Sequence, residues 1–249
     1  MIVRYNFDGN AVDSSGLGNN GTIFGSPTFV ASDSSQAISF NNPFAQQAAT
    51  QFVRLPNSAS ILGLSNSSFT FALRYRSTDT SQQNGRLFGN GGGTPGIFHN
   101  AGSGARNSGS YVYTAAVSIA SDPEGASDPF AFTADGLWHW TIAVLDRNTS
   151  TFSYYVDAHL IVSKPFGLLG SVNFTDILIG ANSWDTNYAA RLTSVDDFRL
   201  YNHALSSAEV NQLVGPVASV PEPSSLLMLG LGLTGLAGRG ALRRFKNWV

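Results

Sequence analysis

The segment 138–156, WHWTIAVLDRNTSTFSYYV, decides the fold of this chain. It contains two runs of apolar and β-branched residues, Trp138–Leu145 and Thr151–Val156, joined by five turn-forming residues, Asp146–Ser150. This arrangement predicts an antiparallel hairpin. Side chains alternate along a strand, so the even-numbered residues of the first run share one face and the odd-numbered residues share the other.

Similar runs extend from Tyr5 to about Val214 and are separated by loops rich in Gly, Asn, Ser and Asp. The clearest further strands are expected at Phe69–Tyr75, Leu160–Val162, Asp176–Gly180 and Val195–Tyr201. Many short strands with almost no helical periodicity predict an all-β, antiparallel two-sheet sandwich. One short helix is expected at Leu205–Leu213, where Ser206 and Glu209 form a capping box.

Composition agrees with a β-sandwich that carries long loops. The chain has 249 residues, of which 26 are Gly and 12% are aromatic. Charged residues make up 12%, which is half of the roughly 25% usual in soluble proteins. The absence of cysteine excludes disulfides, thiol catalysis and cysteine-ligated metals. Lys and Arg are not clustered in residues 1–219, so we expect no nucleic-acid partner.

The C-terminal thirty residues have a different character. Pro221, Glu222 and Pro223 form a rigid, extended segment. The Leu/Gly-rich stretch 226–242 follows; its only charge is Arg239, which can snorkel, and as a helix it would span about 25 Å. The final basic residues should hold this end in the cytoplasm and leave the β domain outside; they are Arg243, Arg244 and Lys246.

This order of Pro-Glu-Pro, apolar span and basic cluster resembles the PEP-CTERM sorting signals of bacteria. The resemblance implies export, recognition by an exosortase-type membrane protease, removal of the span, and a Gram-negative host that makes exopolysaccharide. The alternative is an ordinary membrane anchor that is never cleaved. Because Met1–Phe7 enters the first strand without a secretory signal, we expect the true start of the protein to lie upstream, or the chain to be truncated.

The β region resembles the LamG-like jelly-roll domain of the concanavalin A-like lectin/glucanase group across roughly residues 3–214. The motifs that carry the resemblance are Tyr5–Asn10, Asp13–Gly16, Asn19–Thr22, Leu137–His139, Phe152–Asp157 and Val195–Ser206. One departure is Ala158, where the family usually has a turn glycine. This resemblance implies a jelly-roll sandwich at 1–215. The tail described above implies a linker at 216–225, one hydrophobic helix at 226–242 and a basic tail at 243–249.

Because that group includes glucanases, catalysis has to be considered. A retaining glycosidase needs two carboxylates about 5 Å apart, and this fold usually supplies them from an E-x-D-x-x-E strand. The chain has only Glu124, Glu209 and Glu222, none in such a pattern. Asp196 and Asp197 are adjacent and are expected on opposite faces of a strand. We therefore expect no catalytic residues and no enzyme activity.

The only cofactor that the sequence suggests is a structural calcium ion. Calcium prefers carboxylate and carbonyl oxygens, and related jelly-roll domains often carry one near the positions of Asp8, Asp13 and Asp196. The alternative is that Asp8 and Asp13 are turn-forming residues beside Gly9 and Ser14.

A lectin-like fold without catalytic carboxylates favours a non-catalytic binding module at the cell surface, with extracellular polysaccharide as the partner. Aromatic side chains that could stack on sugar rings, if they are not core residues, are Trp140, Tyr154, Tyr155, Trp184 and Tyr188. The alternatives are a structural or adhesive protein that binds protein partners and, less favoured, a glycoside-active enzyme.

Overall fold

The computed structural model describes residues 1–33, 35–43, 49–79, 85–89, 95–100, 107–113, 118–121, 133–181 and 189–215. For residues 85, 95–100, 107–113 and 118–121 it describes the backbone. Met1–Val210 form one compact unit, and a second unit begins at Asn211.

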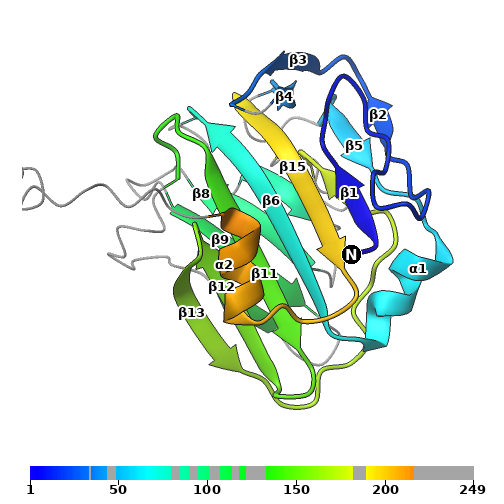
Figure 1. Cartoon of the computed structure of the whole chain (residues 1–249), viewed down its shortest axis with the longest axis vertical. Helices are drawn as coiled ribbons and strands as arrows, with labels where there is room; N and C mark the ends of the chain where they lie inside the picture. Colours follow the sequence, from blue (N-terminus) through cyan, green and yellow to red (C-terminus); the bar gives the residue numbers. More distant parts are fainter. Residues whose placement is uncertain are drawn as a thin grey trace, which may run out of the picture. The chain divides into compact units, whose positions relative to one another are not determined.

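The first unit is built from two antiparallel sheets (Figure 1). The eight-stranded sheet has the order β13 (His159–Pro165), β12 (Thr151–Val156), β11 (His139–Asp146), β6 (Phe69–Ser77), β15 (Thr193–Tyr201), β4 (Gln36–Phe40) and β3 (Thr28–Ala31), and β1 (Val3–Tyr5) also pairs with β15. The seven-stranded sheet has the order β10 (Ser118–Ser121), β9 (Asn107–Tyr113), β8 (Pro95–Asn100), β7 (Gly85–Gly89), β14 (Leu178–Ile179), β5 (Phe52–Arg54) and β2 (Thr22–Phe24). The predicted antiparallel sandwich is confirmed.

The core lies between the sheets and is rich in aromatic rings. The odd-numbered residues of β6 from Phe69 to Tyr75 are all completely buried. The ring of Phe88 on β7 lies 5.0 Å from the ring of Phe71 and 5.0 Å from that of Phe198 on β15, which joins the two sheets. Because side chains alternate along β6, its even-numbered residues face away from this core.

The long strand β15 changes neighbours halfway along its length (Figure 1). Its first residues, Thr193–Val195, pair with β4, and residues 198–200 pair with β1. The register against β6 shifts between these two segments, where Val195 faces Tyr75 and Asp197 faces Arg74. Asp196 is therefore the extra residue of a β-bulge.

Two tight turns confirm the predicted meander β11–β12–β13. Ser150 ends the first turn with φ 53°. The second turn consists of Asp157 and Ala158, with φ 48° and 64°. Positive φ at both central residues is the geometry of a type I′ hairpin turn. Ala158, at the position where the family usually has glycine, therefore adopts a left-handed conformation together with Asp157.

The helices are short. They are α1 (Ala59–Leu62), the 3₁₀ helix η1 (Gly63–Asn66) and α2 (Ser207–Val214), of which only α2 was expected from the sequence. The predicted capping box is confirmed, because the Ser206 amide and hydroxyl donate to Glu209 Oε2 at 2.8 and 2.7 Å, and the Glu209 amide donates to Ser206 Oγ at 3.3 Å.

Candidate functional site

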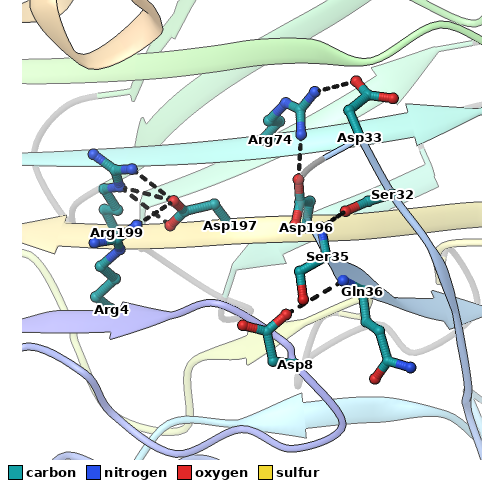
Figure 2. A network of polar contacts seen from close by, with 10 residues as sticks. All are labelled: Arg4, Asp8, Ser32, Asp33, Ser35, Gln36, Arg74, Asp196, Asp197 and Arg199. Atoms are coloured by element: carbon teal, nitrogen blue, oxygen red, sulfur yellow. Dashed lines mark hydrogen bonds and ion pairs between the residues drawn. The ribbon is translucent and has the colours of Figure 1, made fainter.

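The bulge in β15 turns two neighbouring carboxylates toward the same, outer face of the eight-stranded sheet (Figure 2). Asp196 pairs with Arg74, and Asp197 pairs with Arg199 and Arg4. The prediction that the two aspartates face opposite sides was wrong, since it assumed an unbroken strand. The inserted residue resets the alternation, so Val195 and Phe198 both stay in the core.

Asp197 is held by two guanidiniums. Arg199 donates from Nη2 at 2.6 Å and from Nε at 3.1 Å, and Arg4 Nη2 lies 3.2 Å from the same carboxylate. Burial lowers the pKa of Arg199, but its hydrogen bonds and the charge of Asp197 outweigh burial and raise that pKa above its usual value. This group is an ordered ion-pair cluster on the sheet surface.

Asp196 is held by one guanidinium, which it shares with a loop residue. Arg74 Nη1 donates to Asp196, while Arg74 Nη2 lies 2.6 Å from Asp33 in the loop between β3 and β4. Figure 2 shows Arg74 between the two carboxylates. The single positive charge of Arg74 is therefore shared by two carboxylates.

Two tryptophans, Trp138 just before β11 and Trp140 within it, lie against arginine side chains of the same face. Trp140 stands opposite Arg74 in the β11–β6 register, and the Arg199 guanidinium lies 5.2 Å from the centre of its ring. The guanidiniums of Arg74 and Arg76 lie 5.0 and 4.9 Å from the ring centre of Trp138. Trp140 is buried and Trp138 is half-buried. We call this surface the Arg/Trp face; it comprises Arg4, Arg74, Arg76, Trp138, Trp140, Asp196, Asp197 and Arg199.

His139, between the two tryptophans in sequence, is fixed by two carboxylates. Its Nδ1 lies 2.7 Å from Asp157 Oδ2, and its Nε2 lies 3.0 Å from Asp135 Oδ1. Burial lowers the pKa of His139, but the hydrogen bonds and charges of Asp157 and Asp135 outweigh burial and raise the pKa above 6.5. The other Asp157 oxygen accepts the Trp140 amide at 2.8 Å, so this cluster orders the edge of the Arg/Trp face.

The three residues predicted to bind calcium each have partners within the protein. Asp13 accepts the amides of Arg4, Ser15 and Asn19 at 2.8 to 2.9 Å. Burial raises the pKa of Asp13, but these hydrogen bonds outweigh it and lower the pKa below 3.8. Asp8 accepts the Gln36 amide at 3.3 Å, and Asp196 is bound by Arg74.

The predicted calcium ligands are thus not gathered into one cluster. Within the described ranges, no group of three His, Cys, Asp or Glu side chains could hold a metal ion. Calcium binding by Asp8, Asp13 and Asp196 stays a prediction. The hydrogen bonds of Asp13 are those of a turn-forming residue, the alternative that the sequence also offered.

Among the aromatic residues considered for sugar stacking, Trp140 is 9% exposed and Tyr154 belongs to the core. Tyr155 is half-buried. Trp184 and Tyr188 lie outside the described residues. Trp138, which the prediction left out, is the more accessible of the two tryptophans on the Arg/Trp face.

The arginines of the face were also missed, although the sequence contains a signal for some of them. Arg74 and Arg76 alternate with core residues in β6, which places both on the outer face. The bulge has a signal as well, because Val195 and Phe198 are strong core candidates three residues apart, a spacing that breaks the period of two.

The sorting elements lie outside the described residues. They include Pro221, Glu222 and Pro223, the span 226–242, and the basic residues Arg243, Arg244 and Lys246. In the part of the chain that the structure describes, no helix is both long and apolar enough to cross a membrane.

Several solved structures share this fold. The binding domain of Paraclostridial Mosquitocidal Protein 1 matches with a TM-score of 0.65 and 17% identity, over 82% of this chain and 48% of its own. Domain 4 of AbnA, a GH43 extracellular arabinanase from Geobacillus stearothermophilus in complex with arabinotriose, matches with a TM-score of 0.63 and 18% identity, over 86% of this chain and 98% of its own.

A structure of botulinum neurotoxin type C, whose cell entry depends on two ganglioside molecules, matches with a TM-score of 0.64 and 12% identity, over 86% of this chain and 50% of its own. The chain thus spans about half the length of the two toxin chains. A search of curated proteins found no match.

Two family models match the sequence. Residues 219–244 match the PEP-CTERM protein-sorting motif, as the sequence predicted. Residues 47–211, most of the chain, match the concanavalin A-like lectin/glucanases model, and the two-sheet architecture agrees with it. The chain therefore belongs to the concanavalin A-like lectin/glucanases superfamily and carries a C-terminal PEP-CTERM sorting motif.

Proposed function

We propose that this protein is an exported, non-catalytic module that binds polysaccharide at the bacterial cell surface. The observation that carries the proposal is the Arg/Trp face, where a half-buried indole and stacked guanidiniums lie on a rigid sheet. Sugar-binding surfaces combine an apolar ring with a few fixed polar groups, and this face offers both. Structures of the same fold bind arabinotriose or depend on gangliosides for cell entry, which supports a carbohydrate ligand.

The absence of catalysis is supported by the state of the carboxylates. A glycosidase needs one carboxyl group at the leaving oxygen and a second at the sugar carbon or at a water. Asp196 and Asp197 are engaged by Arg74, Arg199 and Arg4. Glu209 is used by the α2 capping box. Each of these three carboxylates therefore has a structural partner within the protein.

The sorting motif supports the place of action. A PEP-CTERM motif at 219–244 fits export followed by recognition by an exosortase-type membrane protease, with the β domain outside the cytoplasmic membrane. Release of the span would leave the lectin-like unit at the cell surface, among extracellular polysaccharides.

The test is a binding measurement with the full-length chain in a mild detergent. A panel of neutral and acidic polysaccharides, arabinan included, should contain at least one that binds saturably without the appearance of new reducing ends. Replacing Trp138 by Ala should weaken that binding about tenfold, whereas the matched control Phe24→Ala, a half-buried ring on the other sheet, should not. Absence of binding across the panel would contradict the proposal.

A second candidate is an adhesive protein with a protein partner. It is favoured by a structure of the same fold, the binding domain of botulinum neurotoxin DC in complex with rat synaptotagmin II, with a TM-score of 0.60 and 11% identity. The two functions are separated by the same panel, because an adhesive protein would bind a specific protein partner and no polysaccharide.

A further inference from the structure

We propose that the Arg/Trp face binds an acidic polysaccharide through a sugar carboxylate, and that Arg76 is the residue that receives this carboxylate. The proposal rests on the proposed function, since it names the substrate class for the same surface.

Four guanidiniums lie on the Arg/Trp face, and three of them have carboxylate partners. Arg4 and Arg199 pair with Asp197, and Arg74 pairs with Asp196 and Asp33. Among the described residues, Arg76 forms no ion pair and no hydrogen bond; its contact is the ring of Trp138. The four guanidiniums and the three carboxylates together carry one net positive charge, and Arg76 is the guanidinium that has no carboxylate partner.

The guanidinium of Arg76 is held in place without using its donors. It stands two residues beyond Arg74 on β6 and lies 4.9 Å from the ring centre of Trp138. Stacking occupies a face of the guanidinium, while its N–H groups point outward in the plane. That planar fork matches the two oxygens of a carboxylate, and its orientation is fixed before binding, which reduces the entropic cost.

The neighbours of Arg76 are suited to a sugar. On one side stands the half-buried ring of Trp138, whose indole N–H donates no hydrogen bond within the described chain. On the other side Arg76 faces Ser194 of β15, whose hydroxyl donates to Ser39 Oγ at 3.1 Å. A uronic acid presents a carboxylate, which suits the guanidinium, and an apolar ring face, which suits the indole.

The carboxylates near Arg76 disfavour a ligand that carries several negative charges close together. Asp33, Asp196 and Asp197 surround Arg74 and Arg199, so a polymer with several charges close together would meet these carboxylates. One carboxylate per sugar ring matches one unpaired guanidinium. This favours polyuronates over densely sulfated chains.

The experiment measures the affinity of the full-length chain, in a mild detergent, for polygalacturonate and for its fully methyl-esterified form. The ester keeps the sugar ring and removes the charge. We expect the wild type to bind polygalacturonate at least tenfold more tightly than the ester, and less tightly as NaCl is raised. Dextran sulfate should bind more weakly than polygalacturonate.

Arg76→Gln should remove most of the preference for polygalacturonate, lowering that affinity about tenfold or more while leaving the affinity for the ester within about twofold. Arg76→Lys keeps the charge but loses the planar fork, so its affinity for polygalacturonate should lie between those of the wild type and Arg76→Gln. The matched control is Arg54→Gln, which removes an exposed arginine that stacks on Phe24 at 4.8 Å on the other sheet. A thermal unfolding curve for each variant separates loss of binding from loss of folding.

The outcomes distinguish this inference from the proposed function. If the chain binds neutral glycans or the ester as well as polygalacturonate, or if Arg76→Gln has no effect, the role of Arg76 is overturned and the carbohydrate-binding function stands. If dextran sulfate is preferred, the carboxylate is the wrong anion and the inference is overturned. If no polysaccharide binds, both proposals fail.

Discussion

At the scale of single residues, Ala158 occupies a backbone conformation that alanine rarely adopts. Its φ of 64° is left-handed, in the turn between β12 and β13. A left-handed residue other than glycine costs about 1–2 kcal/mol, and glycine in turn loses more entropy on folding. Ala158→Gly should therefore raise the free energy of unfolding by about 0.5–1 kcal/mol, measured by urea denaturation.

The control for this substitution is Ala143→Gly in the interior of β11, where the alanine is completely buried. The same change of side chain there should destabilise the protein by about 1 kcal/mol. If Ala158→Gly destabilises the protein to the same extent as Ala143→Gly, the left-handed strain at Ala158 is refuted.

His139 makes stability depend on pH. Its folded-state pKa is raised above 6.5 because Asp157 and Asp135 bind its charged form more strongly than burial disfavours it. A raised pKa means that the stabilisation is fully present below about pH 6.5 and is lost as the pH rises through the higher, folded-state value. The Asp135 pKa is lowered, so its charge is present throughout this range.

We therefore expect His139→Gln to lose more free energy of unfolding at about pH 5.5 than at about pH 9. The measurement is urea denaturation of wild type and variant at both pH values, with His159→Gln, an exposed histidine at the start of β13, as the control. A deficit that is equal at the two pH values, or larger at high pH, would refute the charge-stabilised cluster.

At the scale of elements, Arg147 joins loops that are distant in sequence. Its guanidinium donates to the carbonyls of Ser65 at 3.0 Å, Ser67 at 3.1 Å, Leu169 at 2.9 Å and Gly170 at 3.0 Å. These groups lie around η1 and in the segment that follows β13. The residue thus ties the β11–β12 turn to two other loops.

Arg147→Ala should lower the free energy of unfolding by about 3 kcal/mol, because it removes four charged hydrogen bonds and leaves carbonyls without their donors. Thermal or urea unfolding measures this loss. Arg54→Ala, an exposed arginine without such bonds, should change stability by less than about 0.5 kcal/mol. Equal effects of the two substitutions would show that the carbonyl contacts contribute little.

The elements that the sequence predicted best are those with local signals. The hairpin at 138–156 has alternation and turn residues, and the capping box of Ser206 and Glu209 has its own spacing. Thr151–Val156 was predicted with its observed bounds. The β15 bulge was missed. It lies where β15 changes its neighbour from β4 to β1, and that change depends on strands distant in sequence.

The candidate site was predicted less well for the same physical reason. Arg4, Arg74 and Arg199 come from three strands that the fold brings together, and no local pattern connects them. The calcium prediction grouped three aspartates because they lie in the first and closing segments of the chain; they are Asp8, Asp13 and Asp196. In the structure, Asp13 accepts hydrogen bonds from amides of its own loop. The first and closing strands are neighbours, but their carboxylates are not gathered together.

At the scale of the whole molecule, the sorting motif predicts processing. Replacing Pro221 and Pro223 by Ala removes the rigid, extended segment that a protease would recognise. We expect the variant to keep its full mass in the native host, whereas the wild type is shortened, as measured by mass spectrometry of the cell-associated protein. A variant shortened like the wild type would contradict recognition through this segment, and a wild type that is never shortened would indicate an uncleaved anchor.

The lectin-like unit and the sorting motif together support the proposed function, which is polysaccharide binding outside the cytoplasmic membrane. Its most direct test is an equilibrium binding isotherm of the full-length chain, in a mild detergent, against the panel of neutral and acidic polysaccharides. We expect saturable binding to at least one of them, weakened about tenfold by Trp138→Ala. A flat isotherm for every polysaccharide would contradict it.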